Sequence, residues 1–143
     1  MTLVDFYHLV SSPLERILPV ICEKVLTGGD RLLVVAEPGL LGRLDEQLWN
    51  FSRDAFLPHG RQNGENQPIL LSETPEAVNG ATNIAIADGQ WRDEALSFAR
   101  AFYFFDAGDV DRARSLWRRL KDIPEVESRY WKQDDRGKWV QGP

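Results

Sequence analysis

Residues 111–121, with the sequence DRARSLWRRLK, carry the side chains best suited to recognising a charged ligand. The segment holds five basic residues and one tryptophan. The chain as a whole is acidic, with a formal net charge of −5 and a pI near 5.0. On an acidic protein, cations gathered beside an aromatic ring indicate a docking site for an anionic ligand with an apolar end.

The spacing within this segment predicts two stripes along one helix. The apolar stripe consists of Ala113, Leu116, Trp117 and Leu120, and the basic stripe of Arg114, Arg118 and Lys121. Arginine binds carboxylates through two hydrogen bonds, and a tryptophan edge can wall an apolar pocket. This pattern suits an acidic peptide that ends in an apolar side chain. An ordinary amphipathic helix with a solvated basic face accounts for the same spacing.

A second cluster of aromatic residues surrounds the end of another expected helix. Trp49, Phe51 and Phe56 fall within eight residues. Tryptophan and phenylalanine at a surface are typical anchors of protein interfaces. The alternative is that they cover the sheet edge as part of the core, and Phe51 is the residue we expect to do so.

The motifs of nucleotide-binding and metal-dependent enzymes are missing from the sequence. It contains neither GxGxxG nor GxxxxGK[ST], so no phosphate-binding loop is predicted. Two histidines and the single cysteine, Cys22, do not make a convincing metal site, and Cys22 lies on the apolar face of a helix. We therefore expect no cofactor and no catalysis. A small α/β enzyme that uses Asp88 and His59 at strand ends is the alternative.

Composition and length limit the class of protein. The 143 residues, with 43% hydrophobic and 27% charged side chains, indicate one globular domain. No apolar run approaches the roughly 20 residues that span a bilayer, and the N-terminus does not resemble a signal peptide, so we expect a cytoplasmic protein. The negative charge argues against non-specific binding to nucleic acid. Direct binding of single strands through the arginine-rich helix and the aromatic residues is a further alternative.

The order of the expected elements indicates an α/β fold. Strands are predicted over residues 3–10, 31–36, 68–71, 83–87 and 98–105, and helices over residues 13–27, 40–49 and 109–123. Strands that alternate with helices form a parallel sheet. Residues 59–67 are predicted to be a loop, and residues 126–133 and 138–141 a terminal hairpin around DDRG. Ser12, Pro13 and Glu15 are expected to cap the first helix as a capping box.

Several segments together carry a resemblance to a known family. They are FYHL at 6–9, RLLVVA at 31–36, LDEQLW at 44–49, AFLPH at 55–59, FARAFYFFD at 98–106, ARSLW at 113–117 and YWKQDDRGKWV at 130–140. In this order, and over nearly the whole chain, they resemble the chi subunit of bacterial DNA polymerase III holoenzyme.

The resemblance implies a single Rossmann-like three-layer α/β domain over residues 1–143. Its mostly parallel sheet would carry helices on both faces and a C-terminal β-hairpin, without a nucleotide site. It also implies a non-catalytic accessory subunit that bridges two partners. One is the psi subunit, and through it the clamp loader. The other is the acidic, phenylalanine-ended C-terminal tail of single-stranded DNA-binding protein, so that DNA is reached only indirectly.

The resemblance also implies roles for individual residues. Arg114 and Trp117 fall where the family binds the tail, and Trp49 and Phe56 fall where aromatic residues contact psi or, in some bacteria, a repair helicase. One turn before Arg114, relatives carry another basic residue, whereas this chain has Val110. Tail contacts are therefore also expected from the neighbouring cations, which are Arg112, Arg118 and Lys121.

Overall fold

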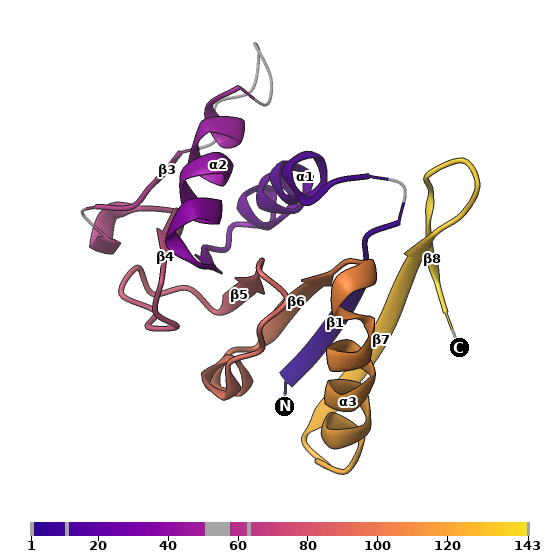
Figure 1. The fold of residues 1–143 in the computed structure, drawn as a ribbon. Coiled ribbons are helices and arrows are strands. Elements are labelled where there is room, and N and C mark those ends of the chain that lie inside the picture. The colour runs from indigo at the N-terminus through magenta and orange to yellow at the C-terminus, as the bar shows by residue number, and fades with distance from the viewer. Residues whose placement is uncertain (1, 11, 51–57, 63, 143) are drawn as a thin grey trace.

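The computed structural model describes residues 2–10, 12–50, 58–62 and 64–142 (Figure 1). The strands are β1 (Thr2–His8), β2 (Leu32–Val35), β3 (His59–Gly60), β4 (Ile69–Ser72), β5 (Asn83–Ile86), β6 (Arg100–Phe105), β7 (Val126–Gln133) and β8 (Trp139–Gln141). The α-helices are α1 (Leu14–Thr27), α2 (Pro38–Trp49) and α3 (Val110–Lys121). Short 3₁₀ helices are η1 (Gly64–Asn66), η2 (Asp93–Ser97) and η3 (Ala107–Asp109).

The strands of the described residues form one eight-stranded sheet in the order β3-β4-β2-β5-β6-β1-β7-β8. Neighbouring strands run parallel up to β7, and β7 pairs with β8 in antiparallel orientation. The predicted α/β class, the mostly parallel sheet and the terminal hairpin are therefore confirmed. The central position of β1, between β6 and β7, places its side chains next to residues more than 90 positions away in sequence.

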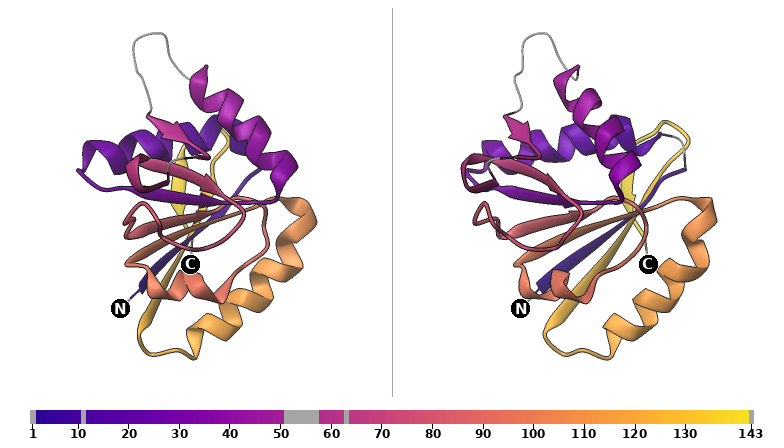
Figure 2. Two further views of the ribbon diagram at one scale, coloured as in Figure 1. Left: turned by 90° about the vertical axis from the view of Figure 1, so that its left-hand side faces the viewer. Right: turned by 60° about the vertical axis from the view of Figure 1, so that its left-hand side comes forward.

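Helices cover both faces of the sheet (Figure 2). Helices α1 and α2 pack on one face, where Leu18, Leu44 and Val34 belong to one buried cluster. Helix α3 packs on the other face, where Leu116 and Leu120 join a second cluster. Adjacent residues of a strand point to opposite faces, which is why the buried strands are apolar throughout. The resulting three-layer arrangement is the one that we expected.

Two local predictions were wrong. Ser12 does not cap α1: Pro13 occupies the N-cap position without a side-chain cap bond, and the Ser12 hydroxyl instead accepts a hydrogen bond from the Gln133 amide at 3.2 Å. Because proline, which has no side-chain acceptor, occupies the N-cap position, the capping box does not form. Residues 59–67 are not wholly a loop, because their described part contains β3 and η1. This strand is only two residues long, too short to show a period in the sequence.

A buried carboxylate ties three strands together on the α1 face. Asp5, on β1, is fully buried. It accepts hydrogen bonds from Arg129 at 2.7 Å, from Arg100 at 2.9 Å and from the Trp131 indole at 3.0 Å. Burial alone would raise the pKa of Asp5, but the bonds from Arg129, Trp131 and Arg100 outweigh it and hold the pKa below its usual value. We call these four residues the Asp5 cluster.

Candidate functional site

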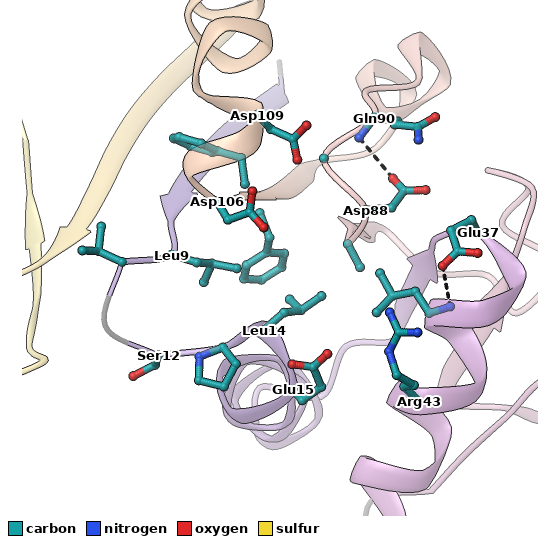
Figure 3. A pocket seen from close by; sticks show the side chains of 17 residues that line it. Leu9, Ser12, Leu14, Glu15, Glu37, Arg43, Asp88, Gln90, Asp106 and Asp109 are labelled. Carbon is teal, nitrogen blue, oxygen red and sulfur yellow. Dashed lines mark hydrogen bonds between the residues drawn. The ribbon is translucent and has the colours of Figure 1, made fainter.

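The carboxyl ends of parallel strands are where ligands bind in open α/β sheets. Here that edge forms a crevice of about 540 Å³. Its charged lining among the described residues consists of Glu15, Glu37, Arg43, Asp88, Asp106 and Asp109 (Figure 3). Carboxylates so outnumber the arginine that a phosphate would be repelled rather than bound.

Among the helix N-termini that border this crevice, that of α2 is closed to a phosphate. An α-helix N-terminus binds anions because its first backbone N–H groups have no partner within the helix. At α2, the Glu37 carboxylate accepts these bonds itself, from Gly39 N at 2.9 Å and Leu40 N at 2.6 Å (Figure 3). At α2 the chain thus supplies its own anion where an external phosphate would otherwise bind.

Asp88 and His59, the residues of the enzyme alternative, do not share a site. His59 is in register with Ile69 and lies at the amino end of the sheet, with its Nε2 atom 3.0 Å from Asp45. Asp88 follows β5 at the carboxyl end and accepts two hydrogen bonds from Arg92, at 2.6 and 2.9 Å. Five residues of extended strand separate these levels, which is about 15 Å. The pair cannot act on one substrate.

Cys22 is also unsuited to chemistry. Its side chain is fully buried, and burial raises the pKa of the thiol to about 12. A thiol of this kind stays protonated and inert at neutral pH. The residue is part of the core beneath α1, as predicted.

A pocket of about 250 Å³ lies between α3 and the sheet. We call it the α3 pocket; it is lined by Phe6, His8, Phe105, Val110, Ala113, Arg114, Trp117 and Tyr130. Trp117 meets the Phe6 ring edge to face, with ring centroids 5.1 Å apart. This contact fixes the half-buried indole as one wall of the pocket.

Arg114 places a positive charge at the rim of this apolar pocket. Its side chain is exposed, and it makes no hydrogen bond or ion pair within the part of the chain that the structure describes. Its field reaches two polar groups of the wall. Burial lowers the pKa of His8 and Arg114 lowers it further, whereas burial raises the pKa of Tyr130 and Arg114 offsets only part of that rise. An anion at the rim would therefore find a guanidinium whose donors are not already used.

The structure separates the predicted cations of α3 into three groups. Arg114 lines the pocket, and Lys121, seven residues on, lies on the same flank of the helix. Arg118 points to solvent between the flanks, where its guanidinium reaches the Ser115 hydroxyl at 3.5 Å. Arg112 lies on the opposite flank, in a groove with Trp91, and its Nη1 is 3.7 Å from an Asp109 carboxylate oxygen.

Val110, where the resemblance implies a basic residue, lines the α3 pocket. Its side chain extends the apolar wall next to Ala113. The substitution therefore removes a charge from the rim and adds apolar surface.

Four residues of the pocket were missed by sequence reasoning: Phe6, His8, Phe105 and Tyr130. They come from β1, β6 and β7, and the pairing of β1 with β7 sets Tyr130 opposite Phe6. The alternation of Phe6 and His8 along a strand was a signal that both share one face. The strand order, which the sequence does not reveal, is what brings this face under α3.

Trp49, the predicted anchor of a second interface, ends α2 and is 57% exposed. Its ring packs on His59, with centroids 4.8 Å apart. A large aromatic side chain that remains more than half exposed is suited to a protein contact. Phe56, its expected companion, and Phe51 lie outside the described residues.

In the part of the chain that the structure describes, no helix is long and apolar enough to cross a membrane. Among the same residues, no group of three or more histidine, cysteine or acidic side chains is placed to hold a metal ion.

The fold is that of a doubly wound α/β protein whose strand-end crevice is lined mainly by carboxylates. Residues 1–124 match the family described as DNA polymerase III chi subunit, HolC. The chain belongs to this family, which assigns it to DNA replication as an accessory subunit of DNA polymerase III. Comparison with curated proteins gives no match.

Proposed function

We propose that this subunit tethers the polymerase assembly to single-stranded DNA that is coated by its binding protein. The α3 pocket would hold the acidic, phenylalanine-ended C-terminal tail of that binding protein. The observation that carries the proposal is the exposed guanidinium of Arg114 at the rim of an aromatic pocket. One charge and one apolar cavity side by side match the carboxylate and the ring of a C-terminal phenylalanine.

The size of the pocket supports this ligand. An apolar cavity of roughly 150 Å³ is enough to bind benzene. The α3 pocket, at about 250 Å³, has room for a phenylalanine side chain. With the ring against Trp117 and Phe6, the terminal carboxylate would lie at the rim, within reach of Arg114.

The remaining cations of the helix would act at longer range. Acidic residues that precede the phenylalanine would pass over Lys121 and Arg118, which are exposed beyond the pocket. Arg112, on the far flank and near Asp109, would contribute least. The acidic body of the protein disfavours DNA itself, so attraction is directed to a peptide at one surface.

A second surface, centred on Trp49, would hold the clamp-loader side of the assembly through a psi-type subunit or, in some bacteria, a repair helicase. The exposure of Trp49 at the end of α2 supports this assignment. Helix α2, which ends at Trp49, packs on the same face of the sheet as α1, whereas α3 packs on the opposite face (Figure 2). The two partners could therefore bind at the same time.

A peptide titration tests the tail site. A labelled peptide with an acidic run and a C-terminal phenylalanine is titrated with the protein while anisotropy is followed. We expect saturable binding that Arg114→Ala weakens by about 2 kcal/mol, or roughly 30-fold, with the free energy of unfolding nearly unchanged. Arg43→Ala, which removes an exposed arginine from the strand-end crevice, is the matched control and should bind normally.

Two results would overturn the tail site: binding that Arg114→Ala leaves intact, or equal losses of binding and stability. Replacing the peptide by a single-stranded oligonucleotide tests the nucleic-acid alternative, for which affinity should fall steeply with salt. For the second surface, Trp49→Ala should impair binding of a psi-type subunit and leave tail binding unchanged. A Trp49→Ala protein that unfolds would instead show that the indole is needed for packing.

A further inference from the structure

His8 occupies a position on the wall of the α3 pocket that the proposed tail site does not yet use. Its ring stacks on Phe105, with centroids 4.8 Å apart and an interplanar angle of 15°. Its Nδ1 atom lies 2.8 Å from the Tyr130 hydroxyl oxygen. Stacking and hydrogen bond together hold the imidazole in one orientation, facing the same pocket as Arg114.

The charged groups around His8 come from every element that packs against it. Arg114 faces it from α3, Lys132 from β7 and Asp106 from the turn after β6. Burial is the largest effect and lowers the pKa of His8; Lys132 and Arg114 lower it further, and Asp106 opposes them. The ring is therefore neutral at pH 7 in the free protein.

In the Nε2–H tautomer of neutral His8, Nδ1 accepts the hydrogen bond and the Tyr130 hydroxyl donates it. Burial raises the pKa of Tyr130, so this hydroxyl is protonated at neutral pH. If a proton from solvent binds Nδ1, the direction of this hydrogen bond reverses. Nδ1–H then donates to the Tyr130 oxygen, and the Tyr130 O–H becomes free to donate to a carboxylate in the pocket.

We propose that His8 is a positioning residue of the α3 pocket, which takes up one proton from solvent as an anionic peptide enters and so makes binding tighter at lower pH. The inference rests on the proposed tail site, since it concerns the same pocket. An anion beside Arg114 offsets the repulsion between Arg114 and a protonated His8, and itself attracts the imidazolium. Binding then delivers one additional free donor, the redirected Tyr130 hydroxyl, and places a positive charge on the imidazole, whose Nδ1–H is bonded to the Tyr130 oxygen.

The sign of the pH dependence follows from linkage. The pKa of His8 is higher in the complex than in the free protein, so binding consumes a proton between the two values. Affinity rises as pH falls through the pKa of the complex and levels off below that of the free protein. Each unit by which the pKa of His8 in the complex exceeds that in the free protein makes binding tenfold tighter at low pH than at high pH. The carboxylates of the peptide stay ionised above about pH 5, so they contribute no trend in this window.

The experiment measures binding of the acidic, phenylalanine-ended peptide at pH 5.5 and pH 8.0. We expect affinity to be about tenfold higher at pH 5.5 for the natural protein. His8→Asn places an amide nitrogen near the position of Nδ1 but does not titrate, so it should bind with less than about a twofold change between the two pH values. Arg114→Ala should bind the peptide weakly at both pH values.

Proton NMR gives an independent readout that needs no variant. The chain has two histidines, and His59, at the amino end of the sheet, serves as the internal reference. Saturation with peptide should raise the pKa of His8, whereas the chemical shift of His59 should not respond to the peptide. Equal affinity at both pH values, together with an unmoved His8, would overturn the inference and leave the tail site standing. No binding at either pH would overturn both.

Discussion

The two faces of the sheet combine arginines with aromatic rings in opposite ways. In the Asp5 cluster, Arg100 and Arg129 converge on one fully buried carboxylate, and their guanidinium groups lie over the rings of Phe102 and Trp131. In the α3 pocket, Arg114 stands beside Trp117 with no carboxylate partner among the described residues.

This difference separates a structural use of arginine from a binding use. Charges that the protein already pairs hold strands β1, β6 and β7 together. A charge left at the rim of an apolar cavity has its interaction energy available for a ligand. Counting arginine and tryptophan along the sequence does not distinguish the two, because the distinction depends on where the carboxylates lie.

The largest effect is expected for Asp5→Asn. The substitution removes the charge on which two arginines and the Trp131 indole converge. Because the arginine side chains are 38% and 30% exposed and can turn to water, we expect a loss of about 2–3 kcal/mol rather than more. Chemical denaturation measures this loss in the free energy of unfolding. Binding of the tail peptide by the folded protein should not change.

The acid dependence of the same variant sharpens this prediction. The pKa of Asp5 is lower in the folded protein than its ordinary value of 3.8. Its contribution is therefore complete above that value and disappears as pH falls through the lower, folded value. The difference in stability between the natural protein and Asp5→Asn should shrink only in this acid range. A difference that shrinks already near neutral pH would contradict the assignment.

An intermediate effect, on both stability and peptide binding, is expected for Trp117→Ala. The indole packs on Phe6 and also walls the α3 pocket, so removing it takes away core contacts and ligand contacts together. We expect about 2 kcal/mol loss of stability and at least tenfold weaker peptide binding. Calorimetry of the variant with and without peptide separates the two. Unchanged binding would place the ligand elsewhere on the protein.

The smallest effects should rank the outer cations of α3. Lys121→Ala and Arg118→Ala should each weaken binding of the tail peptide by about 0.5–1 kcal/mol, because exposed charges are screened by water and salt and so attract the peptide only weakly. Arg112 lies on the opposite flank, so Arg112→Ala should change binding of the tail peptide by no more than the experimental error. Titrations at low and high salt measure the series. If Arg112→Ala proves the most damaging, the peptide lies in the groove beside Trp91 instead.

Much of the fold was predictable because it depends on local periodicity. The stripes of α3, the apolar strand β2 and the terminal hairpin are all visible as patterns within about ten residues. The Asp5 cluster was not predictable, because Arg129 lies 124 positions from Asp5 and becomes its neighbour only through the strand order. His8 and Tyr130 were missed for the same reason, since they meet across 122 positions.

The helix itself held one signal that sequence reasoning did not use. At 100° per residue, Arg112 and Arg114 lie far apart around the axis, although they are close in sequence. The structure places them in different grooves. Helical geometry alone could therefore have separated Arg112 from Arg114 as a candidate contact of the same ligand.

The most direct test of the comparison follows the tryptophan indole N–H signals of ¹⁵N-labelled protein during titration with the acidic, phenylalanine-ended peptide. Trp117 lines the α3 pocket, whereas the Trp131 indole donates to Asp5. We predict that the Trp117 signal shifts saturably and that the Trp131 signal stays in place. A shifting Trp131 signal with a stationary Trp117 signal would show that the Asp5 face binds the peptide, and would contradict the account.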